Sequence, residues 1–169
     1  MRAVRLALAI AVVGATVFAL RAPWRTQRCN VEKRSALAFL ANAQSIASDF
    51  QRQAAATRTA ERMEQCIAVT PGDWQVHFLA GALYEVAGRT PLATARYQAA
   101  LALEERPEIY HAISVLQLAN GQADEGLRNA EKATTFSLEY ADGYEPTLRS
   151  ELYAKVLERR KRLEEQEKR

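Results

Sequence analysis

Residues 74–107, WQVHFLAGALYEVAGRTPLATARYQAALALEERP, carry the strongest structural pattern in the chain. Apolar residues recur at helical spacing on both sides of a glycine, which predicts two short helices joined by a tight turn. Small residues let two helix backbones approach closely, and aromatic residues fill the space beside them. The residues expected to do this are Gly81 and Tyr84 in the first helix, Gly88 at its end, and Ala93, Tyr97 and Ala100 in the second.

These residues resemble the tetratricopeptide repeat (TPR), a helix–turn–helix unit of about 34 residues. A backward shift by one repeat length places Thr59, Met63 and Cys66 at the positions of Ala93, Tyr97 and Ala100, and Phe50 at that of Tyr84. A forward shift that is shorter by one residue moves Gly88 onto Gly121 and places Gly126 and Ala133 at small positions. The resemblance therefore implies an all-α solenoid of about three helix–turn–helix repeats.

The chain is divided by this pattern into an N-terminal apolar segment, a repeat region and a C-terminal cap. In the cap, Pro146 suits the start of a helix on which Leu148, Leu152 and Val156 form an apolar stripe that can cover the last repeat. The expected boundaries are 1–24 for a signal anchor or transmembrane segment, 25–34 for a juxtamembrane linker, 35–140 for the repeats (35–73 degenerate, 74–107 clear, 108–140 relaxed) and 141–169 for the capping helix and charged tail. In the degenerate repeat we expect helices over 35–50 and 54–69.

The N-terminal segment predicts a membrane anchor. Residues 6–20 carry no charge, and a helix from residue 3 to residue 24 would be about 33 Å long, enough to cross a bilayer. Trp24 stands where an interfacial aromatic residue would lie. We expect an uncleaved single span in a bacterial inner membrane, with Ala11, Gly14 and Ala15 as small residues able to pack against another span. The alternative is a signal peptide cleaved near Ala19, which would leave a soluble secreted or periplasmic protein.

The distribution of charge excludes a nucleic-acid-binding surface on the repeats. The chain has 23 basic and 20 acidic residues, but five arginines and no acidic residue lie within residues 1–31. Removing these five leaves 18 basic against 20 acidic residues, a net charge of −2 for residues 32–169. A domain without net positive charge lacks the electrostatic footprint that phosphate backbones require.

Two kinds of observation indicate on which side of the membrane the repeat region lies. More arginines and lysines follow the span than precede it, which by the positive-inside rule favours a cytoplasmic repeat region. In contrast, the short arginine-bearing N-terminal tail of a signal anchor usually stays in the cytoplasm, which would place the repeats on the other side. The separation of Cys29 and Cys66 in the sequence permits a disulfide between the linker and the first repeat. We therefore expect a disulfide and an extracytoplasmic repeat region. The alternative to the disulfide is that Cys66 is only a small core residue.

Residues suited to catalysis or metal binding are few. His77 and His111, which lie on corresponding helices of adjacent repeats, have no cysteine or carboxylate at ligand spacing nearby, so we interpret them as packing or surface residues. The sequence has no phosphate-binding glycine loop, zincin motif or nucleophile elbow. We expect no enzyme, no cofactor, no metal and no small-molecule substrate.

The resemblance to the TPR family also implies a concave groove lined by the first helix of each repeat, which would bind a protein partner. We expect Gln75, Phe78, Ala82, Glu85, Val86, His111, Val115 and Leu118 to face this groove, with Gln44, Ser48, Gln51 and Arg52 at its first-repeat end. The alternative is that Phe78, Val115 and Leu118 pack against the capping helix or neighbouring repeats.

The resulting interpretation is a membrane-anchored TPR adaptor that binds a protein partner in the assembly or stabilisation of a membrane-associated complex. In one alternative, the chain is an integral accessory subunit whose transmembrane helix makes the main contact. In another, it is a soluble secreted protein released by signal cleavage.

Overall fold

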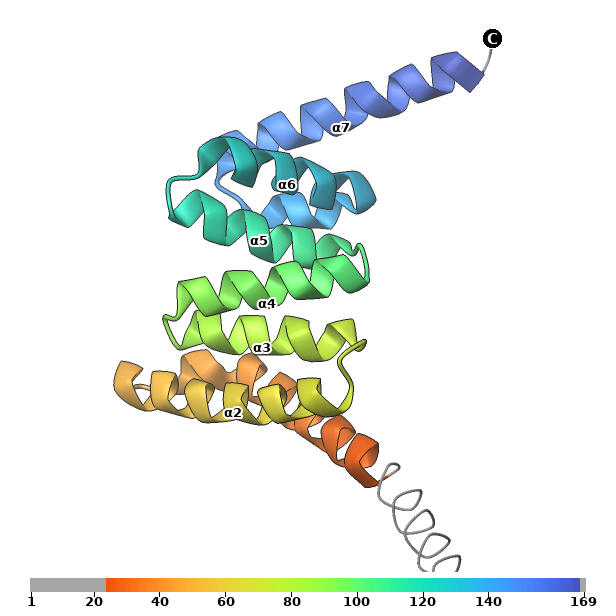
Figure 1. Cartoon of the computed structure of the whole chain (residues 1–169). Coiled ribbons are helices and arrows are strands. Elements are labelled where there is room, and N and C mark those ends of the chain that lie inside the picture. Colours follow the sequence, from red (N-terminus) through yellow and green to blue (C-terminus); the bar gives the residue numbers. More distant parts are fainter. Residues whose placement is uncertain (1–23, 168–169) are drawn as a thin grey trace, which may run out of the picture.

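The computed structural model describes residues 24–167, which form a stack of helices (Figure 1). A first helix covers residues 24–42 of the described chain and ends in the short 3₁₀ helix η1 (Ala43–Ser45). The remaining elements are α2 (Asp49–Val69), α3 (Trp74–Val86), α4 (Thr90–Leu103), α5 (Pro107–Ala119), α6 (Ala123–Phe136), the 3₁₀ helix η2 (Leu138–Gly143) and α7 (Pro146–Glu167).

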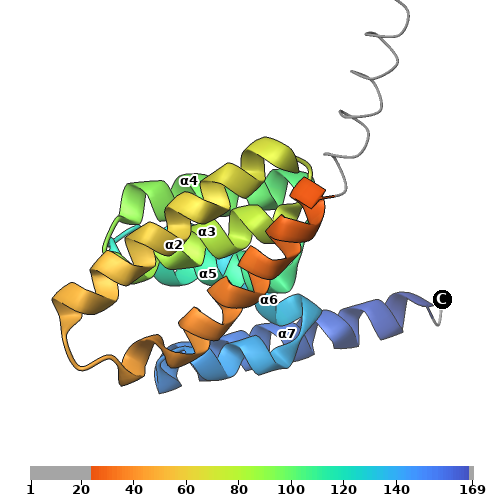
Figure 2. The ribbon, with the colours of Figure 1, turned by 90° about the horizontal axis from the view of Figure 1, so that it is seen from below.

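The helices pack as consecutive antiparallel pairs. In Figures 1 and 2 the first helix pairs with α2 at one end of the stack, followed by the pairs α3–α4 and α5–α6, with α7 across the other end. Each pair packs mainly on the pairs next to it, which is the arrangement of a solenoid. The all-α fold and its order of helical pairs agree with the sequence-based prediction.

The pair α3–α4 is held together by the small and aromatic residues of the predicted pattern. Ala93 and Ala100 are fully buried, and the Tyr97 ring is almost completely buried. A Cβ atom added to Gly81 would lie 2.6 Å from Cδ1 of Tyr97, so only a glycine allows the Tyr97 ring to lie against the α3 backbone.

The tight turns within the second and third pairs depend on glycines with left-handed backbone conformation. Gly88 has φ = +71° and Gly121 has φ = +76°. Glycine adopts positive φ without the steric cost that a Cβ atom imposes. These two glycines are the ones that the forward shift of the repeat pattern aligns, so the turns recur at the predicted spacing.

The second helix of the first pair matches the backward shift. Thr59, Met63 and Cys66 on α2 are all buried, like the α4 residues with which they align. Asp73 caps α3 by accepting a hydrogen bond from the backbone N–H of Gln75 at 3.0 Å.

The first helix of the same pair differs from the prediction. Residues 25–34 were expected as a linker, but they are helical, and the helix expected over 35–50 ends at residue 42. The chain then breaks, and Ser48 caps α2 by accepting a hydrogen bond from the N–H of Gln51 at 3.3 Å. Phe50, aligned with the buried Tyr84, is therefore 80% exposed at the start of α2. The buried stripe of the first helix and its extension η1 is instead Cys29, Ala36 and Ala43, at intervals of seven residues.

The C-terminal segment closes the stack. Leu152 of α7 is buried in a cluster with Ala130 of α6 and Tyr144, against which Leu148 also packs. Val156 is buried one turn further along. The N-terminal half of α7 thus covers the last pair, while its C-terminal half extends beyond the stack (Figure 1).

Among the helices between residues 24 and 167, none combines the length and the apolar character needed to cross a bilayer. The predicted span, residues 3–24, lies outside the described residues except for Trp24, and so do its packing residues Ala11, Gly14 and Ala15.

Candidate functional site

One face of α3 is the open part of the predicted groove. Gln75, Phe78, Ala82, Glu85 and Val86 follow one another at helical spacing and so share this face. They line two hollows whose opposite wall is formed by the first helix and η1. The structure therefore brings together all the groove residues predicted on α3.

The first hollow, here called the Trp74 pocket, has a volume of about 170 Å³. Its walls are mainly apolar and come from three helices. The ring centroids of Trp74 and Phe78 are 6.2 Å apart with planes tilted by 59°, and the Arg106 guanidinium lies 4.7 Å from the Trp74 ring. The residues that line it are Lys33, Leu37, Trp74, Gln75, Phe78, Leu79 and Glu108.

The second hollow, here called the Val86 hollow, is larger and more open, at about 600 Å³. The Glu85 carboxylate accepts a hydrogen bond from the Tyr97 hydroxyl at 2.8 Å, and Arg52 pairs with Asp49. Burial, together with the Glu85 charge, raises the pKa of Tyr97 far above its usual value, so this hydroxyl remains a donor. The residues that line the hollow are Leu40, Ala43, Gln44, Arg52, Ala82, Glu85 and Val86.

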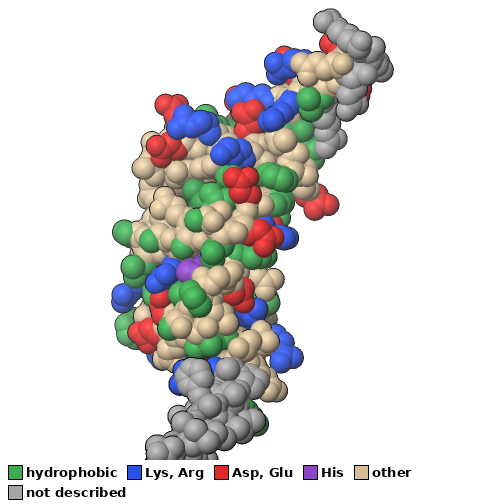
Figure 3. Space-filling model, turned by 45° about the vertical axis from the view of Figure 1, so that its right-hand side comes forward, with side chains coloured by type: hydrophobic (Ala, Val, Ile, Leu, Met, Phe, Trp, Pro, Cys, Tyr) green, Lys and Arg blue, Asp and Glu red, His purple; other side chains and the backbone are tan. Residues whose placement is uncertain are grey.

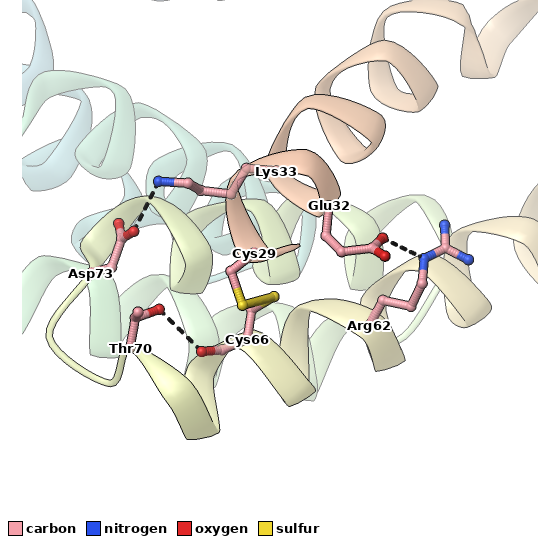
Figure 4. The surroundings of a disulfide bond; sticks show 7 residues. All are labelled: Cys29, Glu32, Lys33, Arg62, Cys66, Thr70 and Asp73. Carbon is pink, nitrogen blue, oxygen red and sulfur yellow. Dashed lines mark hydrogen bonds and ion pairs between the residues drawn. A yellow bond between two sulfur atoms is a disulfide. The ribbon is translucent and has the colours of Figure 1, made fainter. Parts of the chain in front are cut away.

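The wall formed by the first helix is fastened to the repeats at several points (Figure 4). Cys29 and Cys66 form a disulfide with their Cα atoms 5.4 Å apart, and both are buried. Lys33 Nζ lies 2.9 Å from Asp73 Oδ2, and Arg62 Nε lies 2.9 Å from Glu32 Oε2.

Cys29, Lys33, Leu37 and Leu40 follow one another at intervals of four, four and three residues. The disulfide, one of the ion pairs and one wall of each hollow therefore lie on the same side of the first helix.

The predicted groove residues of the third pair are covered by the chain's own C-terminal segment. The His111 ring packs against Tyr140 and Tyr144, with centroids 5.4 and 5.0 Å apart, and its Nδ1 lies 3.0 Å from the Tyr144 hydroxyl. That hydroxyl also hydrogen bonds to Ser114 Oγ. Burial lowers the pKa of His111 and raises that of Tyr144.

The C-terminal segment covers Val115 and Leu118 in the same way. Both pack against the cluster that contains Tyr144 and Leu152, and Leu118 Cγ lies 2.7 Å from the place where a Cβ atom on Gly126 would be. The connection between α6 and α7 and the start of α7 therefore fill this part of the concave surface. Val115 and Leu118 pack on this segment, as in the alternative considered for them, and His111 packs on it as well.

The two histidines are packing residues in separate places. His77 is buried on α3, with Nε2 3.0 Å from the carbonyl oxygen of Pro71, whereas His111 contacts η2 and Tyr144. Within residues 24–167, no group of three or more His, Cys, Asp or Glu side chains is arranged to hold a metal ion.

Charges of both signs are interspersed on the face of the molecule in Figure 3, where hydrophobic side chains lie between them. A mixed surface of this kind does not provide the continuous positive potential that a nucleic-acid backbone requires. At the α3 face, the linings of the two hollows combine apolar side chains with the charged groups of Lys33, Arg52, Glu85 and Glu108.

No family model matches the chain, and no curated protein matches it. Among solved structures it is similar to TTC0263, a thermophilic TPR protein in Thermus thermophilus, with a TM-score of 0.57 and 27% sequence identity. The match covers 75% of this chain and 62% of that protein, so the chain spans about three-fifths of that protein's length. The helical pairs and this similarity together give the chain a TPR-like fold.

Proposed function

We propose that the protein is a membrane-tethered adaptor that binds a segment of a partner protein along the α3 face. The observation that carries the proposal is the open concave surface formed by the Trp74 pocket and the Val86 hollow. The corresponding surface of the third pair is already filled by a segment of the chain itself. The TPR-like fold supports a role in protein–protein interaction rather than catalysis.

The dimensions of this surface suit a short peptide segment. Phe78 and Val86 are eight residues apart on α3, which places them about 12 Å apart along the helix axis. About four residues of extended chain cover that distance. The apolar floor would supply most of the affinity, and Lys33, Arg52 and Glu108 at the rims would fix the direction of the bound segment.

The tether is residues 3–24, whose length and apolar character support a single membrane span. The Cys29–Cys66 disulfide supports a location outside the cytoplasm, because disulfides persist mainly in oxidising compartments. In this arrangement the adaptor would hold its partner close to the bilayer, a position suited to the assembly or stabilisation of a membrane-associated complex.

The groove is tested by purifying the full-length protein in mild detergent and identifying the proteins that remain bound. Val86→Lys introduces a charge into the floor of the Val86 hollow and is expected to lower partner recovery at least about tenfold. Leu92→Lys makes the same kind of change at an exposed position on α4 and is the matched control. Unchanged recovery with Val86→Lys, at unchanged far-UV circular dichroism, would overturn the proposal.

A second candidate function, that of an accessory subunit bound through its span, is favoured by the small residues Ala11, Gly14 and Ala15. Replacing residues 3–24 with an unrelated apolar helix separates the two candidates. Loss of the partner in this variant, with retention in Val86→Lys, would establish the subunit function. The N-terminal residue of the mature protein tests the tether itself: an N-terminus at Leu20 would identify a secreted soluble protein instead.

A further inference from the structure

We infer that a hollow beside the Cys29–Cys66 disulfide binds the phosphate headgroup of an anionic membrane lipid. This hollow, here called the disulfide hollow, has a volume of about 170 Å³. That is room for a phosphate group with accompanying water, since one water takes up about 30 Å³. The inference goes beyond the proposed function and rests on it only for the tether, which places the bilayer at this end of the stack.

Two helices form the walls of the disulfide hollow with the same spacing of residues. The first helix contributes Arg25, Arg28, Cys29 and Glu32, and α2 contributes Arg62, Gln65, Cys66 and Val69. On each helix these are positions i, i+3, i+4 and i+7, which share one face. The disulfide joins the third residue of one face to the third residue of the other (Figure 4). The two walls are therefore held together before a ligand arrives, which lowers the cost of binding.

The lining of the hollow has an excess of positive charge. It contains three arginines and one carboxylate, and that carboxylate, Glu32, is already paired with Arg62 at 2.9 Å. Arg25 and Arg28 are exposed, and neither forms an ion pair with any residue between 24 and 167. Two guanidinium groups are thus available as hydrogen-bond donors, and the planar fork of a guanidinium matches the oxygen atoms of a phosphate.

The position of the hollow along the chain favours a lipid over a dissolved anion. The proposed span ends at Trp24, and Arg28 is about one helical turn further on, about 6 Å along the axis. The headgroup layer on each side of a bilayer is about 5–7 Å thick, so both arginines would lie within it. Trp24 is 73% exposed and Val69 is 37% exposed, and they provide apolar contact for the part of a lipid next to its phosphate.

The charge of the rest of the molecule gives this contact a direction. Residues 24–31 contain two arginines and no acidic residue, whereas residues 32–169 have a net charge of −2. An anionic surface therefore attracts the start of the first helix rather than the repeats. The disulfide hollow shares no lining residue with the Trp74 pocket or the Val86 hollow. Lipid binding would thus hold the stack by its first pair and leave the α3 face unoccupied.

The test measures lipid retention by the full-length protein in mild detergent, with native mass spectrometry as the readout. The two probes are phosphatidylglycerol, which is anionic, and phosphatidylcholine, which carries a phosphate but no net charge. We expect phosphatidylglycerol to be retained at least about tenfold more tightly, and this preference to shrink as the ionic strength rises. Equal retention of the two lipids would overturn the inference.

A pair of double variants locates the site. Arg25→Gln/Arg28→Gln removes the two unpaired guanidinium groups and should lower phosphatidylglycerol retention at least about tenfold. Arg58→Gln/Arg128→Gln makes the same change of charge at exposed positions on α2 and α6 that do not line the hollow, and is the matched control. Far-UV circular dichroism should be unchanged in both. If the first variant retains the lipid as well as the control does, the disulfide hollow is not the site.

Inorganic phosphate, the third probe, distinguishes a lipid from a free anion. It lacks the apolar part of a lipid, which Trp24 and Val69 would contact. We therefore expect that inorganic phosphate at the same concentration does not displace phosphatidylglycerol. Displacement under these conditions would show that the hollow binds the phosphate group alone, and the assignment to a membrane lipid would be wrong.

Failure of this inference and failure of the proposed function give different results. If the lipid preference is absent while Val86→Lys releases the partner, the adaptor function stands and the lipid site is wrong. If the mature protein begins at Leu20, the tether is wrong, and the released protein is tested by flotation with vesicles of each lipid. Flotation with phosphatidylglycerol vesicles alone would then support the lipid site, and flotation with neither lipid, or equally with both, would overturn it.

Discussion

Gly81 is where α3 and α4 come closest, and its missing side chain is a specific requirement of the fold. The Tyr97 ring that fills this space is almost completely buried and cannot swing away. We expect Gly81→Ala to lower the free energy of unfolding by about 1–3 kcal/mol, the usual effect of overpacking a core. The measurement is urea denaturation followed by circular dichroism.

Gly72→Ala is the matched control for this substitution. A Cβ atom on Gly72 meets no atom within 4 Å, and the residue does not have a positive φ. The free energy of unfolding of the Gly72→Ala variant should therefore change little or increase slightly. Equal destabilisation by the two substitutions would mean that the loss at residue 81 is not caused by the Tyr97 contact.

His111 is expected to make stability depend on pH. Burial lowers its pKa in the folded protein below the unfolded value of about 6.5. Between these two pKa values the unfolded chain binds more protons than the folded one, so the free energy of unfolding falls as the pH is lowered below about 6.5. The slope contributed by this residue is at most about 1.4 kcal/mol per pH unit.

The measurement is the free energy of unfolding between about pH 4 and pH 8, in the unmodified protein and in His111→Gln. The variant should lose the part of the pH dependence that lies just below about pH 6.5, because no imidazole remains to be protonated at that position. His77→Gln is the control and should retain it. An identical profile for the unmodified protein and His111→Gln would contradict the expectation.

Individual residues show which parts of the repeat could be predicted from sequence. Met63 and Cys66 are buried as the backward shift of the repeat pattern predicts, because α2 and α4 pack the same face at the same register. Phe50 is exposed although the same shift aligns it with Tyr84. The chain breaks at residues 46–48, just before Phe50, so the register of the repeat is lost on its N-terminal side.

At the level of whole elements, α7 divides into a packed half and a free half. Leu152 is 1% exposed and Leu157 is 57% exposed on the same helix. We expect Leu152→Ala to lower the free energy of unfolding by about 2–5 kcal/mol and Leu157→Ala to change it by less than about 0.5 kcal/mol. Chemical denaturation of both variants is the measurement. Similar losses would show that α7 does not cover the stack through its N-terminal half.

The first helix and η2 were the elements that were hardest to predict from the sequence. The buried stripe of the first helix consists of a cysteine and two alanines, which give a weak hydrophobic signal, and residues 25–34 therefore resembled a linker. The placement of Tyr140 and Tyr144 on His111 depends on contacts between residues that lie far apart in the sequence. Local periodicity contains no information on such contacts, so the sequence could not decide whether Val115 and Leu118 face a partner or pack against the capping helix.

For the molecule as a whole, a linear stack means that its ends can open without the middle. Among the helices of residues 24–167, the first helix has a neighbour on only one side, and the Cys29–Cys66 disulfide fastens it. Replacing both cysteines with alanine should lower stability by about 2–4 kcal/mol, the usual effect of removing a disulfide that closes a loop of this length. Hydrogen exchange should show lost protection in residues 29–42.

Helices α5 and α6 provide the internal reference for this experiment, since they lie towards the other end of the stack (Figure 1). Their protection should change less than that of the first helix. A uniform loss of protection along the stack would show that the disulfide stabilises the whole molecule as one cooperative unit rather than its N-terminal end.

The two ends of the stack also restrict how such a protein can become longer. At the C-terminal end, Tyr144 and α7 cover a face of the last pair that would otherwise accept a further pair. At the other end, the Cys29–Cys66 disulfide fastens the first helix to α2. A segmental duplication that copied the C-terminal end would carry this covering element into the interior and block stacking there. A duplication of residues 74–107 would not, because this pair has a neighbour on each side and short connections. Growth of the array, by evolution or by engineering, is therefore simplest at its middle pair, and each added copy would lengthen the stack while leaving the first helix and the C-terminal cap unchanged.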